Sequence, residues 1–295
     1  MNIGDEIKNS FHRGDSLVKL VYINLAVFVL VRLVSVALTL FNLDSTSYLE
    51  YLELPSAPNL FLARFWTILT YMFLHWSFLH LIFNVIFLYW AGRFFLAYFN
   101  EKQLVGLYLF GGLMGGVFYL LSFNLFPYFE GIKDHSYLLG ASASALAVLA
   151  ASAVTAPHAE IRVPLIGNVK LMYIALILIG IDLLYVTAEN NGGHIAHLGG
   201  AFAGFLFAAA MKKGKDLTVP LNKLLDFLVN LFKRKPKASP KPKFTYTTNN
   251  IDYEYNRRKK EESEEIDAIL DKIKKSGYEN LTAEEKKRLF EQSRK

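Results

Sequence analysis

Long apolar segments alternate with short polar ones along the first two thirds of the chain. A helix needs about 20 mainly apolar residues to cross a bilayer whose hydrocarbon core is roughly 30 Å thick. Six segments reach or approach that length, and we expect a transmembrane helix at each: 17–41, 78–98, 104–126, 137–156, 169–187 and 194–211. The last two are rich in small or polar residues, which is typical of helices that pack around a polar site. The pattern predicts an all-α membrane protein with a six-helix bundle.

Composition supports the membrane class and narrows the chemistry. Of the 295 residues, 53% are hydrophobic and only 20% are charged, which is too apolar for an ordinary soluble protein of this size. The first apolar segment is too long for a signal-peptide core and lacks a small-residue cleavage site, so we expect it to be retained. The chain has no cysteine, which excludes disulfides, a thiolate nucleophile and cysteine-based metal sites. Serine and carboxylate chemistry remain open.

The charges predict the orientation in the membrane. Residues 1–211 hold 10 Lys and Arg against 12 Asp and Glu, and residues 212–295 hold 22 against 14. Basic residues gather at the N-terminus, after the even-numbered segments and in the tail, so by the positive-inside rule both termini are cytoplasmic and loop 42–65 faces outward. For the basic tail, an anionic lipid leaflet is a simpler partner than nucleic acid.

The chain divides into four expected parts. A cytoplasmic N-terminus (1–16) precedes the six-helix domain (17–212), and an amphipathic helix with a basic linker (213–243) follows. Residues 244–295 are expected to form a charged cytoplasmic helical hairpin, in which Thr282 and Glu285 have the spacing of a capping box. The function of this hairpin is not readable from its sequence.

Polar side chains recur near the outer ends of the even-numbered segments. A polar group within a span is costly unless it is paired or hydrated, so each one is a candidate functional residue. His80 and Asn84 in the second segment are four residues apart and share one helix face. Taken alone, this pair also fits a simple hydrogen-bonded contact between helices.

Ser142 and His197 lie at the matching ends of the fourth and sixth segments. A serine in an alanine-rich segment such as 140–143 is, by itself, most often a packing residue. His197 is followed at three and seven residues by Gly200 and Gly204, which leave one face of the helix without side chains. A neighbouring helix can then approach closely enough for a serine–histidine hydrogen bond. Because the topology puts the polar residues of all three segments on one side at similar depth, we expect them to converge.

These motifs resemble those of the rhomboid family of intramembrane proteases, over about residues 15–212. The three that carry the resemblance are His75-x4-His80-x3-Asn84, Gly140-x-Ser142 and Ala196-His197-x2-Gly200-x3-Gly204. Their order, spacing and assignment to segments all agree. The hairpin from about residue 256 to 295 is similar to a tail carried by some bacterial rhomboids.

The resemblance implies a serine endopeptidase that cuts single-span membrane proteins near the outer membrane face. His197 would activate Ser142 in a dyad without a carboxylate, through an acyl-enzyme, and slow turnover is expected from that lack. The backbone N–H of Ser142 and the side chains of His80 and Asn84 would form the oxyanion hole. No cofactor or metal is implied. The expected location is a bacterial inner membrane, with both termini cytoplasmic.

The sequence departs from the family pattern at two positions near the site. Ala143 follows the serine where glycine is frequent, and Leu146 stands where many members have a tyrosine that packs against the histidine. The sequence therefore lacks the tyrosine contact that would orient the His197 ring.

Several residues have competing interpretations. His194 and Ser144 are rivals of His197 and Ser142, but the glycine spacing favours His197, and two residues along a helix turn Ser144 about 200° away. We expect His75 to stabilise the outer loop through hydrogen bonds. Asp182 is expected either to border the cavity or to be a structural aspartate that reaches toward the membrane surface. Arg32 has no evident role.

Two other functions remain possible at this point. A rhomboid-like protein that binds membrane clients without cleaving them would share the fold, but such relatives usually lack the serine or the histidine. A small transporter predicts internal repeats or paired broken helices, and the sequence shows neither.

Overall fold

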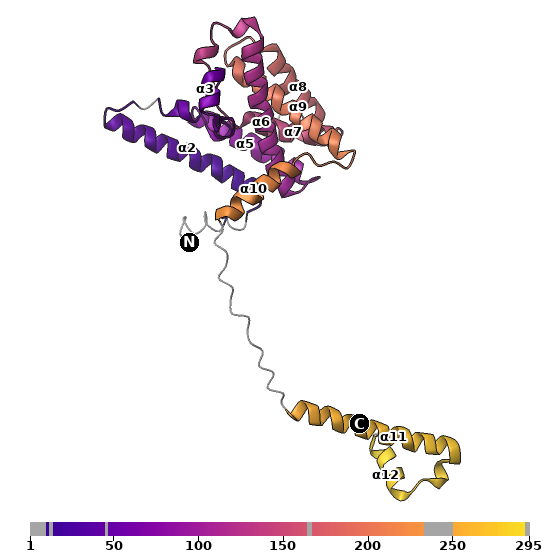
Figure 1. Ribbon diagram of the computed structural model, residues 1–295. Coiled ribbons are helices and arrows are strands. Elements are labelled where there is room, and N and C mark those ends of the chain that lie inside the picture. The colour runs from indigo at the N-terminus through magenta and orange to yellow at the C-terminus, as the bar shows by residue number, and fades with distance from the viewer. Residues whose placement is uncertain (1–9, 12–13, 45–46, 164–166, 233–249, 293–295) are drawn as a thin grey trace. The chain divides into compact units, whose positions relative to one another are not determined.

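The computed structural model describes residues 10–11, 14–44, 47–163, 167–232 and 250–292. The chain divides into two compact units, residues 1–233 and 234–295, and most of the described residues are helical (Figure 1). The helices of the first unit are α2 (Ser16–Leu40), α3 (Pro58–Ala63), α4 (Thr67–Thr70), α5 (Phe78–Leu96), α6 (Glu101–Leu125), α7 (Ser142–Thr155), α8 (Leu171–Leu184), α9 (Asn191–Met211) and α10 (Val219–Phe232). Short 3-10 turns lie at Leu49–Tyr51, Tyr71–Phe73, Pro127–Phe129 and Lys133–His135.

Among the residues that the structure describes, four helices are long and apolar enough to cross a membrane: α2, α5, α6 and α9. Helices α7 and α8 are apolar but have only 14 residues each. Six apolar helices therefore lie where the sequence predicted them, but α5, α7 and α8 are shorter than predicted, with the largest differences at α7 and α8. The fourth was expected to begin at residue 137 and begins at Ser142, because Tyr137 and Leu138 form a strand and Gly140 has a positive φ of 134°.

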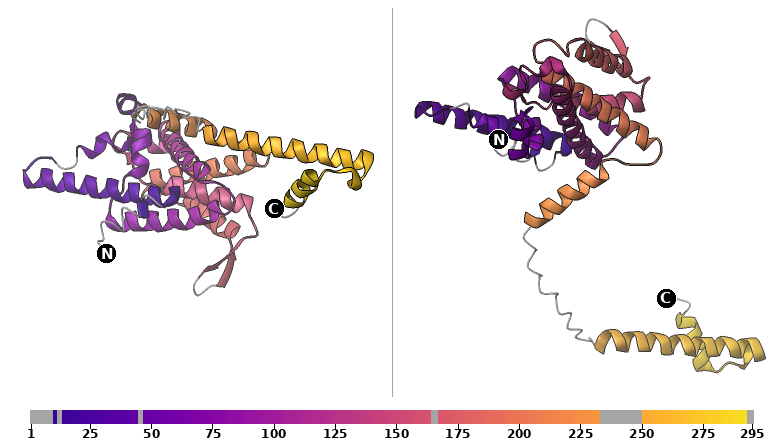
Figure 2. Two further views of the ribbon diagram at one scale, coloured as in Figure 1. Left: turned by 90° about the horizontal axis from the view of Figure 1, so that it is seen from below. Right: turned by 45° about the horizontal axis from the view of Figure 1, so that its top comes forward.

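Two short antiparallel ladders account for the shortened helices. Strand β1 (Leu54–Pro55) pairs with β2 (Tyr137–Leu138), which ties the loop after α2 to the segment before α7. Strands β3 (Glu160–Val163) and β4 (Gly167–Lys170) pair as a hairpin that extends from the helices (Figure 2). Residues 169–170, expected in the fifth helix, belong to β4, so α8 begins at Leu171.

Helix α7 forms the centre of the first unit. It packs against α5, α6, α8 and α9, and every residue from Ala143 to Ala153 is buried. Small side chains make this possible, since eight of these eleven residues are alanine or serine and let neighbouring backbones approach closely. The start of α7 is thereby held in the interior of the bundle.

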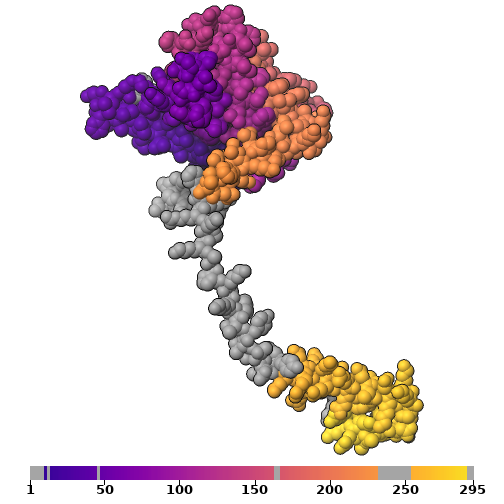
Figure 3. All heavy atoms as spheres, viewed as in Figure 1, coloured from indigo at the N-terminus to yellow at the C-terminus, as the bar shows by residue number. Residues whose placement is uncertain are grey.

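Helix α2 covers the bundle on one side and leaves much of its apolar surface exposed. Its N-cap is Asp15, which accepts a hydrogen bond from the Val18 backbone N–H at 3.0 Å and a second from Arg93 of α5 at 2.8 Å. Toward its other end Leu30 and Leu33 are more than 60% exposed, and the end of α2 projects from the surface of the first unit (Figure 3). Such a surface is expected to face lipid tails.

The amphipathic helix predicted after the bundle is α10. It contacts the beginning of α6, where Lys102 pairs with Asp226 at 3.0 Å. Just before α10, Asp216 accepts a hydrogen bond from Gln103 of α6 at 3.0 Å. The apolar side chains Leu224, Phe227 and Leu231 are exposed. The basic linker expected at 235–243 lies outside the described residues.

The second unit is a helical hairpin, as its sequence predicted. Helix α11 (Asn250–Ser276) ends before Gly277, which has a φ of 79°, and a 3-10 turn (Tyr278–Asn280) leads to α12 (Ala283–Gln292). The capping box is present: the Glu285 backbone N–H donates to Thr282 Oγ1 at 3.3 Å, and the Thr282 N–H donates to Glu285 Oε2 at 2.7 Å.

Candidate active site

Ser142 is the first residue of α7, and the chain conformation just before it aims its side chain into a cavity. Gly140 adopts a φ of 134°, a region that residues with a Cβ rarely occupy. Its backbone N–H donates to the carbonyl of Tyr71 at 2.9 Å, which anchors the turn. At the N-terminus of a helix the backbone N–H groups have no partner within the helix, so the N–H of Ser142 is suited to binding a negative oxygen.

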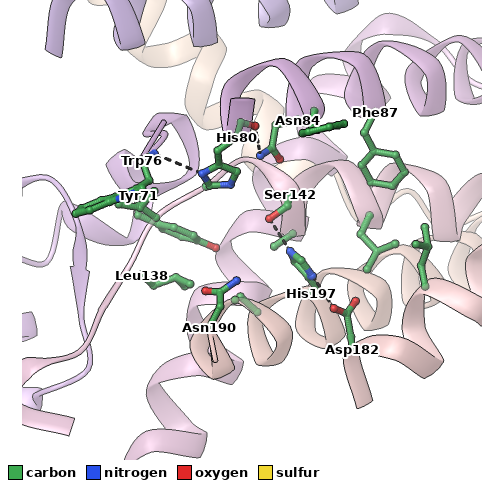
Figure 4. Close-up of a pocket in the computed structure, with 18 of the residues that line it drawn as sticks. Tyr71, Trp76, His80, Asn84, Phe87, Leu138, Ser142, Asp182, Asn190 and His197 are labelled. Atoms are coloured by element: carbon green, nitrogen blue, oxygen red, sulfur yellow. Dashed lines mark hydrogen bonds and ion pairs between the residues drawn. The ribbon is translucent and has the colours of Figure 1, made fainter. Parts of the chain in front are cut away.

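His197 of α9 lies directly opposite Ser142. Its Nε2 atom is 2.6 Å from Ser142 Oγ, a hydrogen-bond distance (Figure 4). Both side chains line a cavity of about 750 Å³, so the pair is accessible to a further molecule. The two residues are 55 positions apart in the sequence and belong to different helices.

Two glycines of α9 allow this approach. A Cβ on Gly200 would lie 2.1 Å from the carbonyl oxygen of Ala143, and one on Gly204 would lie 2.2 Å from that of Ala147. No side chain fits at such distances, so α9 and α7 are in backbone contact along this face. Ala143, where the family often has glycine, fills the space between Gly200 and Gly115 of α6.

His80 lies in the first turn of α5 on the opposite wall of the cavity. Its ring Nδ1 is 3.4 Å from the backbone N–H of Trp76, which can only donate, so Nδ1 accepts. A neutral His80 then carries its proton on Nε2, and that atom lies close to Gly140, where an added Cβ would be 3.4 Å away. The ring thus offers an N–H donor beside the turn that leads to Ser142.

Asn84 follows one helical turn after His80 and also lines the cavity. One N–H of its amide donates to the His80 carbonyl at 2.9 Å, which leaves the second N–H available. Its Oδ1 is buried and has no hydrogen-bond partner among the described residues. The four candidate side chains therefore converge on one cavity, as their positions in the sequence predicted.

A carboxylate stands behind His197, where the resemblance implied none. Asp182 of α8 places Oδ1 2.8 Å from His197 Nδ1 and 2.8 Å from His194 Nδ1. The residue is buried, with 8% of its side chain exposed. The expectation of a dyad without a carboxylate is therefore wrong for this geometry, and so is the reason for expecting slow turnover. The contact arises because Asp182, near the end of α8, faces the side of α9 that carries both histidines.

The same three residues are a possible metal site among those that the structure describes. The ligand atoms of Asp182, His194 and His197 all lie within 4.8 Å of one another. Both 2.8 Å contacts also have the length of ordinary hydrogen bonds between an imidazole N–H and a carboxylate. Hydrogen bonding therefore accounts for the cluster.

Of the two rival residues, Ser144 lies away from the Ser142–His197 contact, whereas His194 meets the same oxygen of Asp182 as His197 does. Ser144 is fully buried and faces α6, since a Cβ on Gly112 would lie 2.8 Å from its Oγ. His75 does not steady the loop by hydrogen bonds as expected: neither ring nitrogen has a partner in the described part of the chain, and the ring packs against His80 with centroids 5.3 Å apart. Arg32 donates to the backbone carbonyl of Trp76 and lies over the ring of Phe28.

The chain matches known proteins over different parts of its length. Residues 62–214 match the family model of the Rhomboid domain, a range that contains every candidate site residue. Residues 249–295 match a family of unknown function (DUF6576). RHOMBOID-like protein 12, mitochondrial, from Arabidopsis thaliana is 32% identical over 169 residues, which cover 54% of this chain and 50% of that protein. The chain thus spans about half the length of the curated relative it matches.

Proposed function

Because the chain belongs to the rhomboid family, we propose that it is an intramembrane serine endopeptidase. The observation that carries the proposal is the 2.6 Å contact between Ser142 Oγ and His197 Nε2 at the wall of an open cavity. A nucleophile within hydrogen-bond reach of its base is the arrangement that covalent catalysis by serine requires. A residue used only for packing has no need of this contact.

The reaction follows from the positions of these atoms. His197 Nε2 takes the proton of Ser142 as Oγ bonds to the carbonyl carbon of a substrate peptide. The C–N bond then breaks, and His197 returns the proton to the leaving amine, which leaves an acyl-enzyme. Water attacks the ester, His197 takes a proton from that water, and Ser142 regains it as the acid is released.

The negative oxygen of the tetrahedral intermediate would be held by three donors. These are the backbone N–H of Ser142, the Nε2–H of His80 and the free amide N–H of Asn84, all at the cavity wall. Donors fixed before the reaction begins stabilise charge as it develops, and losing one typically slows a reaction by about 10²- to 10³-fold.

We further propose six membrane spans, with α7 and α8 as the two short ones and both termini in the cytoplasm. The burial of residues 143–153 supports a place for α7 inside the bundle, where a helix does not need the length of one that faces lipid. The distribution of basic residues supports the orientation, which puts the cavity toward the outer face. A bacterial inner membrane fits the tail, and the substrates would be single-span proteins whose helix ends unwind there.

The basic residues beyond the bundle would hold the tail against an anionic leaflet. The exposed apolar side chains of α10 and the net charge of +8 over residues 212–295 support this role. No nucleic acid is needed to account for the charge.

Cleavage of a model single-span substrate by the purified full chain in liposomes tests the proposal. We expect the wild type to cut, and both Ser142→Ala and His197→Ala to abolish cutting. Ser144→Ala is the matched control and should retain activity. Cleavage that survives Ser142→Ala would overturn the mechanism. Binding of substrates without any cleavage by the wild type would instead support the client-binding alternative.

A further inference from the structure

Asp182 is the one acidic side chain that the structure brings to the Ser142–His197 pair among the described residues. Its Oδ1 lies 2.8 Å from His197 Nδ1, and the opposite ring nitrogen of the same histidine lies 2.6 Å from Ser142 Oγ (Figure 4). The three groups thus form a continuous line, carboxylate to imidazole to hydroxyl, from three different helices.

The contact selects one tautomer of His197. An ionised carboxylate can only accept, so the proton of the neutral imidazole must be on Nδ1. The lone pair is then on Nε2, which is the atom that faces Ser142 and must take its proton. With the opposite tautomer, Nε2 would carry a hydrogen and could not act as the base.

The same contact stabilises the charge that the reaction creates. When Nε2 takes the serine proton, His197 becomes a cation whose two N–H groups point at Asp182 and at the reacting centre. A buried carboxylate at 2.8 Å favours that cation, and it does so without moving.

The position of Asp182 also compensates for an aromatic contact that this sequence lacks. Leu146 stands where many rhomboids have a tyrosine that packs against the histidine, and an aliphatic side chain cannot stack with an imidazole in that way. In this chain the hydrogen bond between His197 Nδ1 and Asp182 Oδ1 fixes the orientation of the imidazole ring instead.

His194 holds the carboxylate in place. Its Nδ1 donates to the same Oδ1 at 2.8 Å, and its ring packs near Tyr185, with centroids 5.9 Å apart. A carboxylate with 8% of its side chain exposed needs partners for its charge, and two imidazole donors supply them. Asp182 is therefore fixed from two sides rather than free to turn toward solvent.

We propose that Asp182 is a positioning residue for His197, which makes the catalytic group a serine–histidine–aspartate triad; this inference rests on the proposed protease function. Asp182 lines the same cavity, and its Oδ1 contacts the two imidazole rings rather than the reacting atoms. Its effect is confined to the chemical step and leaves substrate binding unchanged.

The test is steady-state cleavage by the full chain in liposomes, with kcat and KM measured separately. For Asp182→Asn we expect kcat to fall about 10²- to 10⁴-fold while KM changes less than about threefold, because the amide removes the charge and can favour the wrong tautomer. Asp182→Glu keeps the charge, so its kcat should be at least about tenfold higher than that of Asp182→Asn. Asp134→Asn, at an exposed position of the outer loop, is the matched control and should cut like the wild type.

Three outcomes would overturn the inference. Wild-type kcat in Asp182→Asn would show that His197 needs no partner at Nδ1. A loss that appears in KM, or a loss equal in Asp182→Asn and Asp182→Glu with a lowered unfolding temperature in both, would show a structural role only. Loss of activity with a chelator and its return with Zn²⁺ would make the cluster a metal site. If the wild type itself does not cut, the proposed function fails, and this inference falls with it.

Discussion

Gly200 of α9 lies against the carbonyl oxygen of Ala143 in α7, so closely that a Cβ would be 2.1 Å from that oxygen. Ala143 is the residue after Ser142, and Gly200 lies one helical turn after His197. The backbone contact between the two helices therefore sets the distance between the hydroxyl and the imidazole. Any side chain at residue 200 would change it.

Gly200→Ala should consequently separate the two helices and disrupt the site. We expect at least a tenfold loss of cleavage and a lower unfolding temperature, since forcing a methyl group into a packed interface costs about 1–3 kcal/mol. Cleavage assays and thermal unfolding in detergent measure both effects. Gly180→Ala on α8 is the control, because a Cβ there meets nothing within 4 Å. Equal behaviour of the two variants would contradict the role of the close contact.

Gly140→Ala should impair the site by a different route. The φ of 134° is strained for any residue with a Cβ, and the new methyl group would press on the His80 ring at 3.3 Å. We expect the turn to shift and cleavage to fall at least tenfold, with unfolding less affected than activity. Gly131→Ala, in the outer loop with open space around it, should be neutral in both assays. Full activity of Gly140→Ala would show that the turn does not need this conformation.

Removal of either oxyanion donor should lower kcat without weakening substrate binding. We expect His80→Ala and Asn84→Ala each to reduce kcat by about 10²- to 10³-fold at nearly constant KM, since the donors act on charge that is present only in the transition state. Kinetics with a fluorogenic transmembrane substrate separate the two constants. A variant in which only KM rises would assign the residue to substrate binding instead.

Glu53 in the outer loop should make stability depend on pH. Burial, with a smaller contribution from the charge of Glu50, raises the pKa of Glu53 from its ordinary 4.5 to about 7. The folded protein therefore holds this proton at pH values where the unfolded chain has lost it, so its stability declines as pH rises between these two values. We expect the unfolding temperature of the wild type to fall relative to Glu53→Gln over this window. The unfolding temperature of Glu130→Gln, a change at an exposed site, should vary with pH as that of the wild type does. If the unfolding temperature of Glu53→Gln also varied with pH in the same way as that of the wild type, the raised pKa of Glu53 would be refuted.

The sequence was sufficient for the convergence of the site but not for all of its partners. Hydropathy placed the polar groups at matching helix ends, and Gly200 and Gly204 identified the face of α9 that packs on α7. Asp182 was recognised as a polar residue of the fifth span, but its contact with His197 depends on how α8 is rotated. Its sequence pattern does not reveal that rotation.

The fourth helix was predicted to start too early because a long-range contact, again, is not visible in the local sequence pattern. Tyr137 and Leu138 are apolar and fit a helix by hydropathy, yet they pair with Leu54 and Pro55, more than 80 positions earlier. Pairing between such distant segments leaves no local periodicity to read. Ser142 is therefore the first residue of its helix, which frees its backbone N–H for the oxyanion.

Reaction with a fluorophosphonate probe tests whether Ser142 is a nucleophile activated by His197. Such a probe forms a stable phosphonyl ester with an activated serine, and peptide mass spectrometry locates it. We expect one adduct, on Ser142, that disappears in His197→Ala and persists in Ser144→Ala. An adduct on another residue, or none on a folded wild type that cleaves its substrate, would contradict it.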